Sequence, residues 1–256
     1  MKKKDWTCSP NLEINTNFFT CTTLCEVVEK ILIYERDAFL ALNGSDSAFL
    51  DRFMWIFTGR AVWLPLAFFI LLVLIYKKNW RESLLILLAI ALVITLCDQF
   101  ASHLCKPVFT RFRPTHHPDF MYLVKTVFGY RGGLYGFISS HAANAFGFAT
   151  LMTLIMRDKL FGWTLFFWAF LTAYTRVYLG VHFISDIVPG AIVGVFFGYL
   201  VYWLYSLSRS KLVPAEVKQD EPLYSKQRIR LIVYAIYLTI LVILIFNEPL
   251  AACLQK

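Results

Sequence analysis

Apolar residues of this chain are gathered in long blocks that alternate with short polar stretches. This grouping differs from the spacing of an amphipathic helix or strand in a soluble domain, and about 20 consecutive apolar residues are enough to cross a bilayer. The pattern predicts an all-α integral membrane protein, a helical bundle with six spans. We expect these spans at residues 60–76, 83–103, 141–156, 161–179, 183–206 and 229–248.

Two shorter segments precede the first predicted span. Residues 1–25 are polar and irregular, without the long apolar core and small-residue cleavage site of a secretory signal, so we expect a weakly ordered extension. In residues 26–42, Val27, Ile31 and Leu42 recur at helical spacing while charged residues lie largely off that stripe. A segment this charged does not span a membrane and is typical of an interfacial helix.

The connections between the spans determine the predicted orientation. Basic residues gather at 77–81, 157–159 and 207–228, which all fall on one face of the membrane. The positive-inside rule makes that face cytoplasmic, so in the inner (plasma) membrane the other face, with the 104–140 loop, is periplasmic or extracytoplasmic. The expected segments are an extension at 1–25, a membrane domain at 26–206, a cytoplasmic loop at 207–228, and a further membrane helix with a short tail at 229–256.

The amino-acid composition and net charge indicate which kind of molecule the protein binds. The chain is 58% hydrophobic and only 16% charged, whereas a soluble domain carries about 25% charged residues. A net charge of +8 suits either nucleic acid or anionic lipid. Because most of the chain is expected in lipid, we expect a phosphate-bearing lipid in the bilayer and no nucleic acid. The six cysteines show neither a CxxC pair nor His/Cys ligand spacing, which argues against a zinc site and a disulfide framework.

Three polar clusters lie at span ends on the predicted outer face. Charged groups close to hydrocarbon are costly, so such residues are candidates for function. The first cluster follows the second span, the next precedes the third span, and the last crosses the turn between the fourth and fifth spans. Their members are Lys106, Arg113 and Pro114; Ser139, Ser140 and His141; and Arg176, His182 and Asp186.

Phosphate binding is the chemistry that these residue types favour. A phosphate monoester is doubly negative, and Lys106, Arg113 and Arg176 offer three cations, two of them planar forks that match phosphate oxygens. Backbone amides around Ser139 and Ser140, at the start of the third span, would add donors where the helix dipole favours anions. The alternative for basic residues after a span is ordinary interfacial anchoring.

His182 and Asp186 form a second chemical pattern. Their spacing of four residues places them one helical turn apart on one face. A carboxylate bonded to one ring nitrogen fixes the tautomer and leaves the other nitrogen as a nucleophile. The pair would otherwise only fix two span ends.

Together, Lys-x6-Arg-Pro, Ser-x-His and Arg-x5-His-x3-Asp resemble the three motifs of the type 2 phosphatidic acid phosphatase (PAP2) superfamily, over residues 26–206. The resemblance implies a bundle of the PAP2/haloperoxidase type that hydrolyses a lipid phosphate or diphosphate, without a metal or other cofactor. It also implies a phosphohistidine on His182, with His141 first as general acid and then as the base that activates water.

The resemblance extends to particular branches of the superfamily. The Leu-Asn-Gly end of the 26–42 helix and the compact core resemble bacterial undecaprenyl-pyrophosphate phosphatases, so undecaprenyl pyrophosphate is the preferred substrate. The polar 115–138 loop points instead to a larger sugar head group, as in the lipid A phosphatases, and phospholipid phosphates rank third. The oligomeric state stays open.

Two positions depart from the superfamily pattern, and several polar residues lie outside it. Ser140 stands where the second motif has glycine, and Thr175 replaces the serine before Arg176. We interpret both as tolerated, with Thr175 as a possible residue behind the site. Asp98, inside the second span, either orients Lys106 from behind or contacts another helix. Arg111 either assists substrate binding or is a solvated loop charge, and we interpret it as the latter. We interpret His116 and His117 as loop residues and not as ligands.

Three other functions remain as alternatives. A phosphotransferase of the same superfamily would pass the phosphate to a second lipid instead of water. A vanadium haloperoxidase shares the residue constellation, but those enzymes are soluble. A non-catalytic transporter of lipid or anion would keep its flux after loss of His182.

Overall fold

The structure of the protein is a computed structural model that describes residues 18–214 and 223–255. The described residues form helices joined by turns and loops, with no β-strand beyond an isolated bridge between Phe112 and Tyr135. The α-helices are α1 (Phe18–Leu42), α2 (Ala48–Thr58), α3 (Leu64–Ile75), α4 (Trp80–Gln99), α5 (Lys106–Phe109), α6 (Ser140–Met156), α7 (Lys159–Tyr178), α8 (Ile184–Leu212), α10 (Lys226–Ile245) and α11 (Asn247–Leu254).

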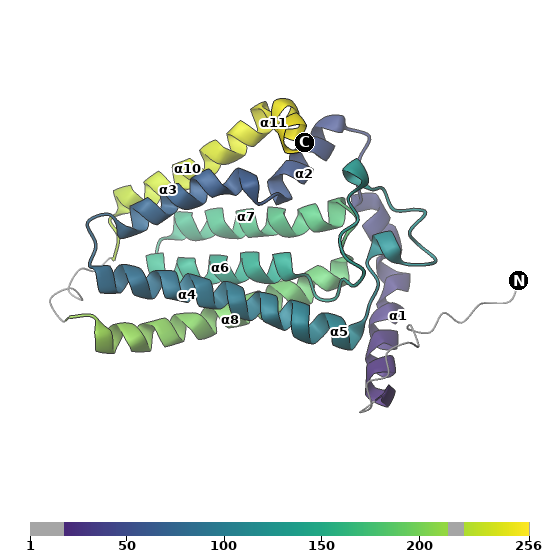
Figure 1. Cartoon of the computed structure of the whole chain (residues 1–256), viewed down its shortest axis with the longest axis horizontal. Helices are drawn as coiled ribbons and strands as arrows, with labels where there is room; N and C mark the ends of the chain where they lie inside the picture. Colours follow the sequence, from purple (N-terminus) through teal and green to yellow (C-terminus); the bar gives the residue numbers. More distant parts are fainter. Residues whose placement is uncertain (1–17, 215–222, 256) are drawn as a thin grey trace, which may run out of the picture.

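The long helices lie lengthwise beside one another, and α6 is at the centre because it packs against α4, α7 and α8 (Figure 1). The helix α10 packs against α3 and α7, and α2 and α11 pack together at one end. At that same end α1 stands across the bundle instead of along it. The main hydrophobic core lies between the lengthwise helices and includes Ile86, Ala149, Leu151 and Val201.

Glycines on α8 explain its close contact with α6. A Cβ atom on Gly194 would lie 2.3 Å from the Ala143 carbonyl oxygen, and one on Gly190 would lie 2.7 Å from the Ser139 carbonyl oxygen. Small residues four apart let two backbones approach, as is common between membrane helices. This approach brings the first turns of α6 and α8 together, and the Ser139 amide donates to the Asp186 carbonyl at 3.0 Å.

The number of spans differs from the sequence prediction. By length and composition, three helical stretches can cross a membrane, namely Trp80–Phe109, Ile184–Leu212 and Lys226–Ile245. A fourth is the pair Ala48–Thr58 and Ala61–Ile75, whose halves are bent by 69°. The central α6 has 17 residues, fewer than the ~20 that cross a bilayer unaided. The structure supports three to four spans, and the count of six stays a prediction.

The N-terminal segment also differs in part from its prediction. Most of the expected extension, residues 1–17, lies outside the described residues, but residues 18–25 belong to α1 instead of a weakly ordered segment. Directly after α1, the Asn43 side chain donates to the carbonyls of Lys125 and Tyr178. The position of α1 across the bundle is compatible with an interfacial helix, and its location in a membrane interface stays a prediction.

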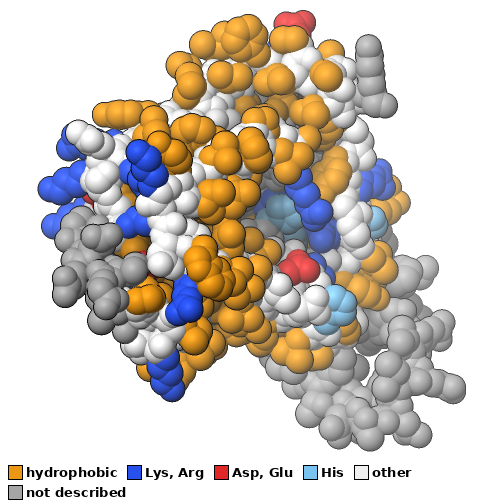
Figure 2. Space-filling view, turned by 60° about the vertical axis from the view of Figure 1, so that its left-hand side comes forward, with side chains coloured by type: hydrophobic (Ala, Val, Ile, Leu, Met, Phe, Trp, Pro, Cys, Tyr) orange, Lys and Arg blue, Asp and Glu red, His pale blue; other side chains and the backbone are white. Residues whose placement is uncertain are grey.

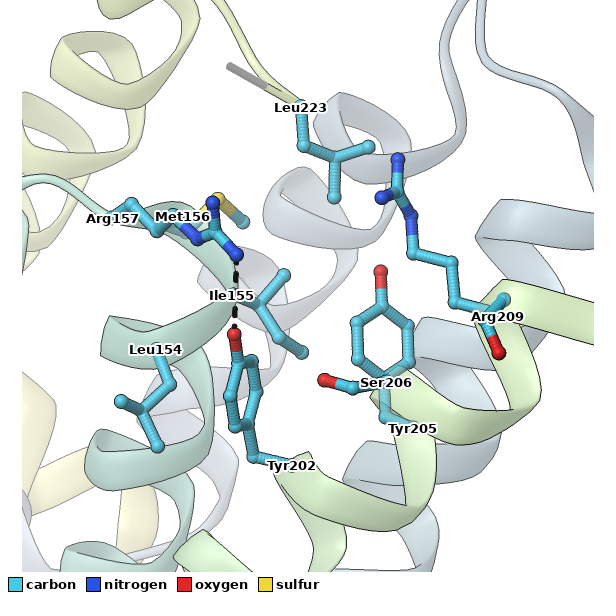
Figure 3. Close-up of a pocket in the computed structure, with 10 residues that line it drawn as sticks. Leu154, Ile155, Met156, Arg157, Tyr202, Tyr205, Ser206, Arg209 and Leu223 are labelled. Carbon is cyan, nitrogen blue, oxygen red and sulfur yellow. Dashed lines mark hydrogen bonds between the residues drawn. The ribbon is translucent and has the colours of Figure 1, made fainter. Parts of the chain in front are cut away.

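The described residues of the basic connections, 77–81, 157–159, 207–214 and 223–228, lie at the end of the bundle opposite α1 (Figure 1). A pocket of about 490 Å³ opens there between α6 and α8. Its lining includes Arg157, which donates to the Tyr202 hydroxyl at 3.4 Å, and Arg209 (Figure 3). Arg209 in turn binds the buried Glu82 of α4 at 2.5 Å. This end combines basic surface residues with one buried ion pair.

Candidate active site

The three predicted clusters meet at the α1 end of the bundle. Lys106 opens α5, directly after a π-helical segment at Phe100–Cys105 that continues α4. Such segments are frequent at functional sites. Arg113 follows in the loop, His141 lies in the first turn of α6, and Arg176 lies in the last turn of α7. His182 and Asp186 lie in the α7–α8 turn and the first turn of α8.

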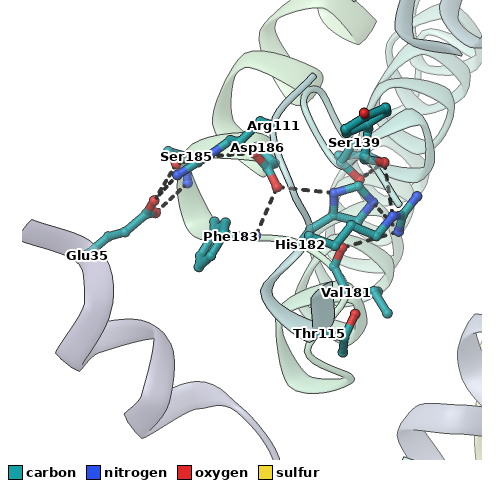
Figure 4. A network of polar contacts seen from close by, with 12 residues as sticks. Glu35, Arg111, Thr115, Ser139, Val181, His182, Phe183, Ser185 and Asp186 are labelled. Atoms are coloured by element: carbon teal, nitrogen blue, oxygen red, sulfur yellow. Dashed lines mark hydrogen bonds and ion pairs between the residues drawn. The ribbon is translucent and has the colours of Figure 1, made fainter. Parts of the chain in front are cut away.

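The partners of His182 fix its tautomer. Its Nε2 atom lies 3.2 Å from the Arg113 guanidinium, and its Nδ1 atom lies 3.4 Å from Asp186 Oδ2 (Figure 4). A guanidinium only donates hydrogen bonds, so Nε2 must be the acceptor and Nδ1 must carry the proton. The Nδ1 proton then faces the carboxylate, and the lone pair of Nε2 faces the basic side of the site. This arrangement is the one required of a nucleophilic imidazole.

Electrostatics keep that ring neutral. His182 is completely buried, and burial, followed by the charges of Arg113, Arg176 and Lys106, lowers its pKa well below the usual value. Both effects disfavour the imidazolium form. At neutral pH the ring therefore has a lone pair on Nε2.

Arg113 is held from three sides. Besides His182, it donates to the carbonyls of Tyr135 and Val181 at 3.1 and 3.2 Å. Burial, and then the like charge of Arg176, lowers its pKa. Crowding of like charges in a buried site costs free energy unless an anion joins them, and a dianionic phosphate is such an anion.

Arg176 is nearly buried, and two residues that the sequence analysis did not single out hold it. It donates to the Thr58 hydroxyl at 2.7 Å and to the Tyr130 hydroxyl at 3.1 Å. Burial alone would raise the pKa of Tyr130, but the charge and hydrogen bond of Arg176, with the charges of Arg113 and Arg60, lower it. No sequence motif marks Tyr130, because it belongs to the loop without recognisable pattern.

Lys106 and Asp98 lie on the α4–α5 side of the site. The Lys106 ammonium donates to the Ser102 hydroxyl at 3.1 Å, one turn earlier. Asp98 lines a groove beside the site, together with His141 and Arg60. Its negative charge acts on the Lys106 ammonium, which donates its hydrogen bond to Ser102 and not to Asp98. Asp98 thus influences Lys106 through its charge.

The second motif is built around the start of α6. The Ser139 hydroxyl caps the helix by accepting from the Ala142 amide at 3.4 Å, and its own amide donates to Asp186. Both polar groups of Ser139 thus have structural partners. Ser140 is the first residue of α6 and has no positive φ, which explains why the superfamily glycine is dispensable here. The amides of Ser140 and His141 belong to the first turn, where no intrahelical acceptor exists.

The remaining predicted residues lie behind or beside the site. The Thr175 hydroxyl donates to the Thr172 carbonyl at 2.6 Å, so it is engaged within α7. In the loop, His116 Nδ1 is 3.1 Å from the Thr115 hydroxyl, and His117 is 3.3 Å from Glu29 of α1. Across the described residues, no group of three or more His, Cys, Asp and Glu side chains has the arrangement of a metal site.

Arg111 corrects the sequence analysis. We expected a solvated loop charge, but its side chain is 0% exposed and bridges Asp186 at 2.7 Å and Glu35 at 2.9 Å (Figure 4). It also donates to the Ser185 hydroxyl at 2.6 Å and covers the Phe183 ring at 4.5 Å. The prediction failed because the acidic partners come from α1 and α8, far away in the sequence.

An apolar groove of about 560 Å³ runs from the site along the bundle. Figure 2 shows a hollow with histidine and basic side chains next to a broad hydrophobic surface. The polar end of the groove includes Arg60, Asp98 and His141. Such a shape fits a molecule with a charged head and long hydrocarbon tails. The apolar lining includes Leu66, Ile70, Leu87, Ile94, Phe148 and Trp168.

Known proteins resemble this chain closely. The PAP2 superfamily profile matches residues 84–210. A lipid A 4'-phosphatase of Porphyromonas gingivalis is 40% identical over 229 residues, which are 89% of this chain and 97% of the relative. A lipid A 4'-phosphatase of Bacteroides thetaiotaomicron is 34% identical over 229 residues, 86% of this chain and 98% of the relative. The crystal structure of Aquifex aeolicus LpxE has a TM-score of 0.48 and 27% identity, covering 66% of this chain and 94% of that one.

A helical bundle that gathers a histidine, an aspartate and three cations at one end, beside an apolar groove, has the chemistry to bind a lipid phosphate. The chain belongs to the PAP2 superfamily, and it is a lipid phosphatase that hydrolyses phosphate monoesters. The family assignment from the three motifs is thereby confirmed.

Proposed function

We propose that the protein is a lipid A 4'-phosphatase that uses His182 as its nucleophile. The observation that carries the mechanism is the position of His182, whose Nε2 lone pair faces Arg113 while its Nδ1 proton faces Asp186. A phosphate placed among Arg113, Arg176 and Lys106 would meet that lone pair directly. The first-turn amides of Ser140 and His141 would bind another phosphate oxygen at the positive end of α6.

In the first step, His182 Nε2 attacks the phosphorus atom. The new N–P bond forms as the bond between phosphorus and the sugar oxygen breaks. The three cations balance the charge on the transferring phosphoryl group, which is the main catalytic need of this chemistry. His141 donates a proton to the departing sugar oxygen, which leaves as an alcohol.

In the second step, water replaces the histidine. His141, now neutral, accepts a proton from the water as its oxygen attacks phosphorus, and the N–P bond breaks. Inorganic phosphate leaves, and both histidines return to their starting forms. Because water is the acceptor, this reaction differs from that of a phosphotransferase of the same superfamily, which would need a second lipid.

Lipid A now ranks before undecaprenyl pyrophosphate, the reverse of the order that the sequence favoured. Two relatives that match over almost their whole length are lipid A 4'-phosphatases. Lipid A is an acylated sugar, and the apolar groove beside His141 offers room for acyl chains. The 115–138 loop, which places Tyr130 against Arg176, would lie over its sugar head group.

The proposed reaction takes place on the periplasmic face of the inner membrane. The described parts of the basic connections lie at the end of the bundle opposite α1, and the positive-inside rule would keep them in the cytoplasm. All six predicted spans contain a helix, so six crossings remain our proposal even though α6 and α7 do not stand out by length and composition.

Substrate panels test this function. Purified full-length protein in detergent should release phosphate from lipid A without an added acceptor lipid, faster than from undecaprenyl pyrophosphate or phosphatidic acid. Mass spectrometry of the product should show loss of the 4'-phosphate with the 1-phosphate retained. In a strain without the gene, lipid A should gain one phosphate while bacitracin tolerance stays unchanged. Release from undecaprenyl pyrophosphate alone, with lower bacitracin tolerance in that strain, would reverse our choice.

A further inference from the structure

Arg111 connects the N-terminal helix to the partner of the histidine. Its NH1 atom donates to Asp186 Oδ1 at 2.7 Å, and its NH2 atom donates to Glu35 Oε1 at 2.9 Å. The side chains of Arg111 and Asp186 are 0% exposed and that of Glu35 is 8% exposed. One guanidinium therefore joins two carboxylates away from water, where such bonds are strong and directional.

The contacts of Asp186 show what this bond does for the histidine. The oxygen Oδ1 accepts from Arg111, while Oδ2 accepts from the Phe183 amide at 3.0 Å and faces His182 Nδ1 at 3.4 Å. With both oxygens engaged, the carboxylate has a single rotation, and Oδ2 points at the imidazole. Without the donor on Oδ1, the carboxylate would be free to turn, and its unpaired oxygen would favour protonation.

Glu35 completes the arrangement from α1. Its Oε2 atom accepts from the Ser185 amide at 2.8 Å, and Oε1 accepts from the Ser185 hydroxyl at 2.5 Å as well as from Arg111. Ser185 directly precedes Asp186, so Glu35 holds both the backbone at the start of α8 and the guanidinium that binds Asp186 (Figure 4).

Charge balance gives Glu35 a second effect. The guanidinium of Arg111 carries one positive charge between two carboxylates, so its attraction is divided between Glu35 and Asp186. If the Glu35 charge were removed, Arg111 would draw mainly on Asp186, because its other carboxylate neighbour, Glu29, lies 3.8 Å from Nε and is 28% exposed. Asp186 would then be a weaker acceptor for His182. A positive charge no longer balanced would also disfavour protonation of the nearby imidazole.

We propose that Glu35 and Arg111 are positioning residues that hold Asp186 toward His182, so that α1 is a part of the active site. The idea rests on the proposed role of His182 as nucleophile. It goes beyond the three motifs, because Glu35 lies before the segment that matches the PAP2 profile. Neither residue touches the substrate phosphate, and each acts through Asp186.

A purely structural role, the anchoring of α1 to the bundle, predicts a different outcome. An anchor would affect the melting temperature and the amount of folded protein, but the kcat per folded molecule and the pH profile would stay the same. Positioning changes kcat while KM is preserved, because the phosphate-binding cations are unaffected. The two roles are separated by kinetics on folded protein.

The central experiment is Glu35→Gln in the full-length protein, assayed with lipid A in detergent. We expect kcat to fall about 10- to 100-fold, as for other residues that orient a ligand or nucleophile through a partner, with KM within twofold. The acid limb of kcat/KM should move to lower pH, because a negative charge near His182 is lost. The matched control is Glu29→Gln. Glu29 is on the same helix, but its carboxylate lies 3.8 Å from Arg111 Nε and is 28% exposed. The kcat of the Glu29→Gln variant should change less than twofold.

A double-mutant cycle provides the decisive arm. In an Asp186→Asn background, Glu35→Gln should cause no further loss, because its effect passes through Asp186. Additive losses, or a wild-type kcat and pH profile in folded Glu35→Gln protein, would overturn the proposal.

If Glu35→Gln does not fold, Arg111→Lys serves instead. One ammonium cannot bond both carboxylates, so kcat should fall at least 10-fold. Full activity of Arg111→Lys would equally overturn it. Full activity of His182→Ala would instead disprove the nucleophile itself.

Discussion

Each end of the bundle buries an ion pair between an arginine and a carboxylate. At the α1 end, Arg111 binds Asp186 at 2.7 Å, and at the opposite end Arg209 binds Glu82 at 2.5 Å. In both pairs the carboxylate is almost completely buried and belongs to a long helix of the bundle. Burial of a charged pair is thus common to both ends and does not by itself identify a catalytic site.

The neighbours of each pair make the difference. Asp186 also faces His182, which in turn faces Arg113 with Arg176 and Lys106 nearby, so that end carries an excess of buried positive charge. Glu82 also accepts from the Tyr205 hydroxyl at 3.4 Å, which adds a neutral partner to a balanced pair. A balanced pair needs no ligand, whereas an excess of cations beside a neutral histidine is relieved by an anion. The excess charge and the histidine distinguish the end that we propose to be catalytic.

The largest effect should follow the loss of the nucleophile. His182→Ala should lower kcat by about 10³-fold or more, because removing a group that forms the covalent intermediate removes the two-step route. Phosphate release from lipid A by the purified variant measures it. The control at the other end is Tyr205→Phe, which should keep kcat within twofold. Comparable losses of kcat in the two variants would contradict the assignment of catalysis to the α1 end alone.

An identical substitution at the two ends should have unequal consequences. Arg176→Lys should lower kcat/KM about 100-fold, since a point charge cannot replace a planar fork that is held by Thr58 and Tyr130 and binds phosphate. Arg209→Lys should change kcat/KM less than threefold, although weakening the pair with Glu82 should lower the melting temperature. Steady-state kinetics with lipid A, corrected for the folded fraction, gives both values. Equal losses would assign Arg176 a structural role.

The pH dependence of kcat/KM should respond to the excess positive charge around His182. The pKa of His182 lies below its usual value through burial and the charge of Arg113, so the ring stays neutral, and active, as pH falls below the ordinary histidine range. Arg113→Gln should raise that pKa, and the acid limb of its normalised kcat/KM profile should lie at higher pH than in the wild type. The substrate phosphate titrates identically in both proteins and cancels in the comparison.

The lowered pKa of His182 also makes the stability of the folded protein depend on pH. The pH profiles therefore need a control for unfolding. Because the pKa of His182 is lower in the folded than in the unfolded protein, the unfolded chain binds the proton more tightly. The stability contribution is complete above the unfolded pKa of about 6.5 and is lost as pH falls through the folded value. Melting temperatures at each pH therefore have to accompany the rates. Coincident acid limbs in folded wild type and Arg113→Gln would contradict the assignment.

Much of the fold could be predicted because hydrophobic blocks determine helices directly. A helix lies at each of the six predicted spans, although α4 continues through a π-helical segment to Phe109 and the predicted loop after residue 207 begins within α8. The short α2 was missed, because its apolar residues adjoin the first predicted span and its 69° bend depends on tertiary packing. Local pattern predicts where helices form but not how they bend.

The residues of the candidate site likewise divide into those that local sequence patterns predict and those that depend on tertiary packing. For residues within motifs, such as His182 and Asp186, the sequence could predict that the side chains lie together, because their short spacing places them one turn apart. Arg111 and Tyr130 were missed because their partners, Glu35 and Arg176, lie 76 and 46 residues away in the sequence. Only the packing of α1 and the 115–138 loop onto the bundle shows that these side chains belong to the site.

The smallest expected effect concerns the departure from the superfamily at Ser140. This residue is the first of α6, as Lys159 is the first of α7 at the opposite end. Glycine at either position should cost stability by no more than about 1 kcal/mol, because glycine loses more backbone freedom in a helix. We expect Ser140→Gly to keep kcat/KM for lipid A within twofold, since its backbone amide, and not its hydroxyl, is the proposed phosphate donor. Lys159→Gly should show the same change in melting temperature and unaltered kinetics. A tenfold rise in KM confined to Ser140→Gly would instead show that the hydroxyl itself contacts the phosphate.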